Sequence, residues 1–279
     1  MRLGFVGVGK WAQKLATAFR ACGAEIVAYD RSSPKCGNCL VSLSKCTCSL
    51  VSHPSGFGLY CPWRDQLTDP SIDAIVAVAP PEITTEVALA CAAAGKAVCA
   101  TKPLFDHPGT IRAPFYVDFW RLWSEAHQYR RRRREFEFCG QGPIRSFPGL
   151  LDYGPHVMAA VLDVAPEAKL ISWAPAIGCE PGELVAATFS VDGDEVRTLF
   201  GNGAHKSIRN IWGWAEDGED IGHEAKSVVL QRFCQSFLND ISEGFVDTRL
   251  LRLSRDGMRE LRRIREMATA SAAKPRSEP

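Results

Sequence analysis

The feature that most constrains this chain is a glycine-rich turn between a short apolar run and a helical pattern. Residues 3 to 8 form the apolar run, and residues 11 to 21 carry apolar side chains at helical spacing. Gly23 then marks a helix end, and residues 25 to 30 form a second apolar run that closes on an acid. The start of the chain therefore predicts a strand, a helix and a second strand, in that order.

The turn after the first strand has the pattern G-x-G-x-x-A, written out as Gly7-Val8-Gly9-Lys10-Trp11-Ala12. Gly7 permits the tight turn, Gly9 lets the backbone approach a pyrophosphate, and the small Ala12 lets the helix pack closely on the strand. The amide groups of the helix N-terminus favour phosphate. In this context the pattern predicts a dinucleotide site that includes Lys10 and Trp11, and the alternative is an ordinary glycine turn.

The acid at the end of the second strand, Asp30, bears on the choice of cofactor. A carboxylate there can accept hydrogen bonds from the ribose hydroxyls and would repel a 2′-phosphate, which favours NAD. The neighbouring Arg31 could instead receive a 2′-phosphate, so NADP stays open as the alternative.

The next segments continue the alternation of strands and helices. Residues 73 to 79 predict a third strand that Pro80-Pro81 ends, residues 82 to 94 predict a helix capped by Gly95, and residues 96 to 100 predict a fourth strand. This order predicts an α/β Rossmann domain with a doubly wound parallel sheet. We place that domain at residues 1–106.

The pattern changes in residues 107–279, where runs of strands are followed by helices. Asp192-Gly193-Asp194 reads as a hairpin turn. The sequence predicts an α+β domain with an open, largely antiparallel sheet. Its expected helices are 151–163, 224–243 and 248–270, and its expected strands are 169–174, 184–191, 195–201 and 207–214.

Three stretches resemble the Gfo/Idh/MocA family, named for glucose-fructose oxidoreductase, inositol dehydrogenase and a rhizopine-catabolism protein. The first is the loop from Gly7 to Ala12. The second is the segment 73–82 followed by 95–98 and Thr101-Lys102-Pro103-Leu104, which is similar to the family's strand, helix and E-K-P segment. The third, Asp152-Tyr153-Gly154-Pro155-His156, is similar to its D-x-G-x-H motif.

The resemblance implies an NAD(P)-dependent dehydrogenase or reductase that transfers a hydride to or from a carbinol or carbonyl carbon of a sugar-like or other small polar metabolite. It implies that Lys102 lies by the nicotinamide ribose and the substrate oxygen, that His156 is the general acid/base, and that Asp152 is its partner. We add Pro80 to the expected cofactor contacts. The resemblance also implies a homo-oligomer formed through the C-terminal sheet.

The chemistry of these side chains agrees with those roles. Asp152 and His156 are four residues apart and share one face of a helix. Imidazole has a pKa near neutrality and can take the hydroxyl proton as hydride leaves, while an ammonium can stabilise charge on oxygen. The alternatives are an ordinary histidine at a helix start and, for Lys102, a solvated lysine after a strand.

Two departures from the family pattern leave other activities open. Thr101 replaces the glutamate of E-K-P, and Thr84 stands where the family often has a histidine. An imine or heterocycle reductase, or a non-catalytic regulator that binds a metal and a dinucleotide, is the alternative function. Side chains that could line an unusual pocket, or simply pack in a core, are Tyr116, Asp118, Trp120 and Trp123.

A cysteine-rich insert at about residues 34–61 follows the second strand. Its two close pairs could supply four thiolates to a structural zinc ion, with an iron–sulfur cluster or free thiols as alternatives. The candidate ligands are Cys36, Cys39, Cys46 and Cys48.

Charge and hydropathy exclude several kinds of partner. The formal net charge is +1, which gives no broad footprint for nucleic acid. We find neither a run of about 18 apolar residues nor a signal segment, and we expect a cytoplasmic protein that does not bind membranes. The run Arg130 to Arg134 predicts a solvated segment, with a site for a phosphorylated substrate or an acidic partner as the alternative.

Overall fold

The protein forms two compact units, the first made of residues 1–123 and 225–251 and the second of residues 124–224 and 252–279. The computed structural model describes residues 1–30, 58–125, 127–128, 138–143, 151, 154–175, 184–203 and 225–272. The first unit therefore extends beyond the predicted division at residue 106. It also includes residues 225–251 from near the end of the chain.

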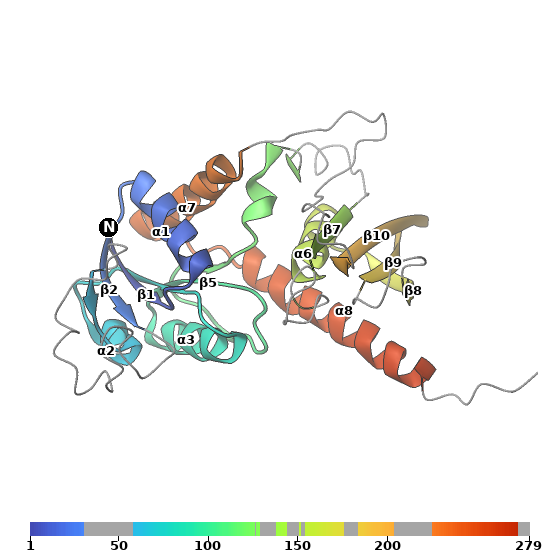
Figure 1. The fold of residues 1–279 in the computed structure, drawn as a ribbon, viewed down its shortest axis with the longest axis horizontal. Helices are drawn as coiled ribbons and strands as arrows, with labels where there is room; N and C mark the ends of the chain where they lie inside the picture. Colours follow the sequence, from blue (N-terminus) through green and yellow to red (C-terminus); the bar gives the residue numbers. More distant parts are fainter. Residues whose placement is uncertain are drawn as a thin grey trace, which may run out of the picture. The chain divides into compact units, whose positions relative to one another are not determined.

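The first unit is built on a six-stranded sheet in the order β3-β2-β1-β4-β5-β6 (Figure 1). Every pairing in it is parallel. This is the doubly wound order, in which the strand order reverses between β1 and β4. It confirms the predicted Rossmann fold. The strands are β1 (Arg2–Val6), β2 (Glu25–Asp30), β3 (Leu59–Tyr60), β4 (Ala74–Ala77), β5 (Ala97–Ala100) and β6 (Phe115–Val117).

Helices cover both faces of this sheet, which explains why its central strands are apolar throughout. Helices α1 (Lys10–Ala21) and α7 (Lys226–Glu243) lie side by side on one face, and α2 (Trp63–Thr68) and α3 (Pro81–Ala94) lie on the other (Figure 1). All four residues of β4 and of β5 are buried. Such strands read as continuous hydrophobic runs because neither face meets water.

Aromatic packing explains why α7 belongs to the first unit. The ring of Phe237 on α7 lies 6.0 Å from Phe19 on α1 and 5.1 Å from Tyr116 on β6. The Tyr116 hydroxyl also donates a 2.7 Å hydrogen bond to Asp240 Oδ2 on α7. Trp123, the last residue of the short helix η3 (Trp120–Trp123), packs 5.1 Å from Phe233. Tyr116 and Trp123 are therefore packing residues of this interface.

The second unit contains a four-stranded sheet in the order β7-β10-β9-β8, which confirms a largely antiparallel sheet. Its one parallel pairing joins β10 to β7. Asp192 and Gly193 turn the chain between β9 and β10 with φ angles of 54° and 98°, as the predicted hairpin turn requires. The strands are β7 (Phe138–Pro143), β8 (Lys169–Pro175), β9 (Leu184–Val191) and β10 (Asp194–Gly203). The predicted strand 207–214 lies outside the described residues.

Helix α6 (Gly154–Val164) is buried along its whole length and packs against β7 and β10. Its Met158 lies against Gly257 of helix α8 (Arg249–Ala272), where an added Cβ would come within 3.0 Å of Met158 Cβ. The residues of α8 from 252 onwards belong to this second unit.

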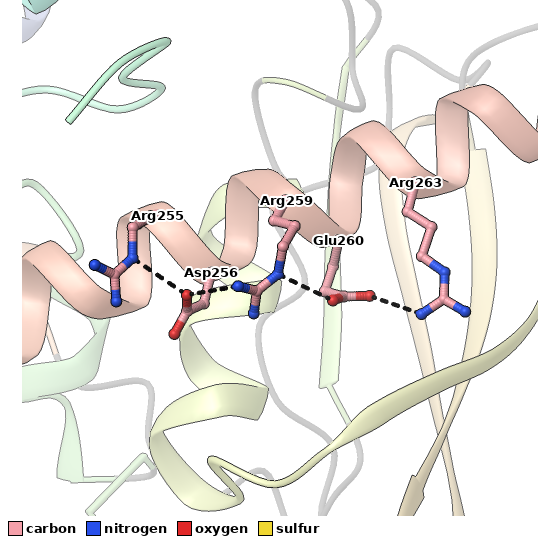
Figure 2. A network of polar contacts seen from close by, with 5 residues as sticks. All are labelled: Arg255, Asp256, Arg259, Glu260 and Arg263. Carbon is pink, nitrogen blue, oxygen red and sulfur yellow. Dashed lines mark hydrogen bonds and ion pairs between the residues drawn. The ribbon is translucent and has the colours of Figure 1, made fainter.

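One face of α8 carries alternating arginines and acids (Figure 2). Arg255 and Arg259 both contact Asp256 Oδ1, at 3.4 and 3.3 Å, and Arg259 and Arg263 contact the two oxygens of Glu260 at 3.8 Å. The arginine side chains are exposed, whereas the acids are largely covered, so the ladder lies at the border of a solvated helix face. Among the helices that the structure describes, none is long and apolar enough to cross a membrane.

Candidate dinucleotide and catalytic site

The glycine turn between β1 and α1 is shaped by two glycines with different surroundings. Gly7 has a φ of 98°, and a Cβ there would lie 2.1 Å from the carbonyl oxygen of Val78. Its amide donates a 2.9 Å hydrogen bond to the Asp30 carbonyl. A Cβ on Gly9, by contrast, would meet no heavy atom within 4 Å. Gly7 is thus required by the fold, while Gly9 leaves open space in front of the turn.

The N-terminus of α1 fits a diphosphate. Gly9 is the N-cap residue and has no side chain to cap the helix, and the first turn contains no acid. The amide groups at the start of a helix carry no intrahelical partner and attract anions. Lys10 is exposed at this end, whereas Ala12 is fully buried against the sheet. The predicted loop residues therefore come together around a position that suits the phosphates of a dinucleotide.

Asp30 ends β2 at the same edge of the sheet, as predicted, and has an additional partner. Its Oδ2 accepts a 2.9 Å hydrogen bond from the amide of Trp63, the first residue of α2. The carboxylate is thereby fixed between β2 and the start of α2, and only 9% of the residue is exposed. Arg31 lies outside the described residues, so the contact with ribose stays a prediction.

The carboxyl ends of β4 and β5 bring Pro80 and Lys102 to this edge. Pro80 is the N-cap of α3, and Lys102 follows β5 and precedes Pro103 through a cis peptide bond. Ligands of doubly wound sheets bind outside the carboxyl ends of the strands. The position of Lys102 in the first unit is therefore compatible with a role beside a bound cofactor.

The two threonines that depart from the family pattern hold the backbone of this edge. The Thr84 hydroxyl donates a 2.9 Å hydrogen bond to the Ala79 carbonyl and accepts one of 3.2 Å from the Ala79 amide. The Thr101 hydroxyl donates to the Ala77 carbonyl at 3.2 Å. Both replacements therefore support the loops after β4 and β5.

A buried carboxylate, Asp118, stands directly after β6 and was predicted only as a pocket-lining candidate. The indole N–H of Trp11, in the first turn of α1, donates a 2.6 Å hydrogen bond to Asp118 Oδ2. Burial raises the pKa of Asp118 to about 6, against the lowering effects of the Trp11 bond and of the positive charges of Lys102 and Lys226. This edge of the sheet thus contains an acid that titrates near neutral pH.

Lys226, the first residue of α7, completes this cluster and was not predicted. Its ammonium lies 4.5 Å from the ring centre of Trp11 and 5.0 Å from that of Trp120. The two rings are 6.3 Å apart. A cation over aromatic faces is attracted by the ring quadrupole. We call Trp11, Asp118, Trp120 and Lys226 the Trp11–Asp118 cluster.

His156 belongs to the second unit, where it is the third residue of α6 and is 8% exposed. Its predicted partner Asp152 lies outside the described residues. The same helix carries Asp163, whose Oδ2 lies 2.9 Å from His127 Nε2 in a pair that is almost completely buried. The catalytic set of Lys102, Asp152 and His156 therefore stays a prediction.

The cysteine-rich insert also lies outside the described residues, including Cys36, Cys39, Cys46 and Cys48. Within the described part of the chain, no cluster of three or more histidines, cysteines or acids could hold a metal ion. The zinc site stays a prediction, which metal analysis of the purified protein tests. The absence of stoichiometric zinc or iron would contradict it. The run Arg130 to Arg134 is likewise outside the described residues.

Comparison with known proteins agrees with the fold and the loop. Residues 1–113 match the GFO_IDH_MocA model, described as an oxidoreductase family with an NAD-binding Rossmann fold. No curated protein sequence matches the chain.

Three solved structures share the fold over most of the chain. Apo scyllo-inositol dehydrogenase from Lactobacillus casei is 16% identical, with 92% of this chain and 94% of that one covered and a TM-score of 0.65. Levoglucosan dehydrogenase in complex with NADH is 13% identical, with 94% and 96% covered and a TM-score of 0.66. Biliverdin reductase from Synechocystis sp. PCC 6803, in complex with biliverdin and NADP+, is 15% identical, with 94% and 98% covered and a TM-score of 0.65. Residues 1–113 are thus similar to the NAD-binding Rossmann domain of the Gfo/Idh/MocA oxidoreductase family.

Proposed function

We propose that this protein transfers a hydride between a nicotinamide dinucleotide and a hydroxyl-bearing or carbonyl carbon of a sugar-like or other small polar metabolite. The observation that carries the proposal is the open helix N-terminus at Gly9, in a sheet of the doubly wound order, with Lys102 on the same carboxyl edge. A diphosphate at Gly9 would place the rest of the dinucleotide along this edge.

The proposed residue roles follow from charge and proton affinity. The bound nicotinamide supplies the hydride donor or acceptor. The Lys102 ammonium donates a hydrogen bond to the reacting oxygen and stabilises negative charge that develops there. His156 takes the hydroxyl proton when an alcohol is oxidised and returns it when a carbonyl is reduced, and Asp152 fixes the orientation of the imidazole.

We propose NAD as the preferred cofactor because of Asp30. Its carboxylate is fixed at the end of β2 by the Trp63 amide. A fixed negative charge there would accept hydrogen bonds from ribose hydroxyls and repel a 2′-phosphate. Tighter binding of NADPH than of NADH, measured by titration, would contradict this preference.

The substrate class is tested with purified protein and a panel of polyols, sugars, ketones and cyclic imines, followed by nicotinamide absorbance. We expect turnover of at least one hydroxyl or carbonyl compound and a loss of about 10²–10⁴-fold in His156→Ala, because general acid/base catalysis contributes this much. An exposed lysine on α1 gives the control variant Lys14→Met, which should keep full activity.

The outcome of the panel separates the proposal from its alternatives. Turnover of imines alone would identify a heterocycle reductase. Cofactor binding without turnover of any compound would favour a regulator. Full activity in His156→Ala would remove that residue from the mechanism.

We also propose a homo-oligomer that forms through the sheet of the second unit. Light scattering of the purified protein tests this proposal, and a monomer would contradict it.

A further inference from the structure

We propose that Asp118 is a positioning residue of the active site, whose buried negative charge holds the Lys102 ammonium in place and anchors Trp11 of the dinucleotide loop. The proposal rests on the proposed function of Lys102. It adds a group outside the expected Lys102, Asp152 and His156 set. One buried carboxylate would then couple the loop that binds the cofactor to the lysine that contacts the substrate.

The register of neighbouring strands places Asp118 and Lys102 at one edge of the sheet. Val117 of β6 pairs with Ala100 of β5, and the Asp118 amide donates a 2.8 Å hydrogen bond to the Ala100 carbonyl. Asp118 and Lys102 thus follow adjacent parallel strands at the same carboxyl edge. Parallel strands bring residues that are distant in sequence to one edge, where ligands of this fold bind.

The two carboxylate oxygens of Asp118 have different surroundings. Oδ2 accepts the Trp11 indole N–H at 2.6 Å. Oδ1 is buried and has no hydrogen-bond partner among the described residues. Buried polar atoms are nearly always hydrogen-bonded, so an exception in a cofactor-binding edge points to a functional constraint. A purely structural anchor for Trp11 would need only an acceptor and no buried charge.

Positive charges surround Asp118. Lys102, from the loop after β5, and Lys226, from α7, both favour its ionised form. The thiols of Cys99 on β5 and Cys234 on α7 also face it, and burial raises the pKa of both thiols, which keeps them neutral. The backbone of Trp120 on η3 also favours the ionised form. The two charged side chains that act on the pKa of Asp118 are therefore both cations.

Two variants separate the charge of Asp118 from its hydrogen bond. Asp118→Asn keeps an acceptor for Trp11 and removes the charge, whereas Trp11→Phe keeps an aromatic ring and removes the donor. Asp240→Asn is the matched control, because Asp240 also accepts a hydrogen bond from an aromatic side chain, the Tyr116 hydroxyl at 2.7 Å. The acidic limb of kcat/KM against pH is the first readout.

The expected results follow from the titration of Asp118. In the unmodified protein kcat/KM should rise with pH through about 6, where the carboxylate ionises. Asp118→Asn should lose this limb and at least about tenfold in kcat, because Lys102 is no longer held by a neighbouring charge. Trp11→Phe should shift the limb to higher pH, since a bond that favours the ionised form is lost. Asp240→Asn should keep the pH profile of the unmodified protein. An Asp118→Asn enzyme with an unchanged kcat and an unchanged acidic limb of kcat/KM would overturn the proposal.

A second readout does not depend on turnover, so it separates failure of this inference from failure of the proposed function. Trace labelling with acetic anhydride, quantified by peptide mass spectrometry, compares the reactivity of Lys102 with that of the exposed Lys14. An ammonium held by a neighbouring carboxylate is less accessible to the reagent, so the Lys102 to Lys14 ratio should rise at least about threefold in Asp118→Asn. It should stay unchanged in Asp240→Asn. An unchanged ratio in Asp118→Asn overturns the proposal whether or not a substrate has been found.

Discussion

Two acids of the first unit make nearly the same hydrogen bond in opposite electrostatic surroundings. Asp118 accepts the indole N–H of Trp11 at 2.6 Å and has two lysines nearby. Asp240 accepts the hydroxyl of Tyr116 at 2.7 Å, and its charged neighbours are Asp247 and Glu243. The first lies at the carboxyl edge of the sheet and the second beside the aromatic packing of α7. The comparison sets a charge that we propose to act in catalysis against a bond that fastens two elements.

The largest effect on stability should come from the packing region. Phe237 is fully buried between α1 and β6, and Phe237→Ala should lower the free energy of unfolding by about 3–5 kcal/mol. Denaturant unfolding measures this change. Activity per folded molecule should stay near normal, and a loss in kcat at full folding would show that the packing region takes part in catalysis.

The largest effect on activity should come from the carboxyl edge. Lys102→Met should reduce kcat by about 10²–10³-fold, the cost of removing one group that stabilises charge on oxygen. The unfolding midpoint should change little, because Lys102 is partly exposed. Steady-state kinetics beside Lys14→Met give the measurement, and equal activity in the two variants would exclude Lys102 from the mechanism.

Asp118→Asn should stabilise the protein while it impairs the enzyme. Burial raises the pKa of Asp118 from 3.8 to about 6, so the folded state binds this proton more tightly than the unfolded chain does. The free energy of unfolding then falls as pH rises through this window, by up to about 3 kcal/mol at 1.36 kcal/mol per pKa unit. At pH 7 the variant should unfold at a higher temperature than the unmodified protein. A lower unfolding midpoint would show that the charge stabilises the fold.

The smallest effect should come from the Tyr116 hydroxyl. Tyr116→Phe removes the bonds to Asp240 and Ser236 and should cost about 0.5–1.5 kcal/mol, with no change in the acidic limb of kcat/KM. Thermal unfolding and a pH profile check both parts. A shifted limb would mean that the two acids are coupled and that the comparison fails.

The sequence predicted those parts of the first unit that depend on local patterns. The strand, glycine turn, helix and acid from residue 3 to Asp30 each leave a signal within a few residues. The strands before Pro80 and Lys102 are buried on both faces and therefore read as apolar runs. Strand β6 was missed because it has only three residues. A run of three residues is too short to show the alternation of side chains that is typical of a strand.

The parts that the sequence did not predict depend on distant residues. Helix α7 was predicted as a helix, but its return to the first unit depends on aromatic contacts with Phe19 and Tyr116. Trp11 and Asp118 are 107 positions apart, so no local pattern joins them. Their one sequence signal is an acid directly after an apolar stretch, a position that a parallel sheet places at its ligand-binding edge.

The central claim, that the turn at Gly9 holds a dinucleotide, is tested most directly by titrating NADH into the unmodified protein and into Gly9→Asp. A Cβ at Gly9 would meet no heavy atom within 4 Å, so the variant should fold with an unchanged unfolding midpoint. Its carboxylate would occupy the phosphate position and bring a like charge to it. We predict saturable binding to the unmodified protein and at least about a tenfold weaker affinity in the variant. Equal affinity in the two proteins would contradict the account.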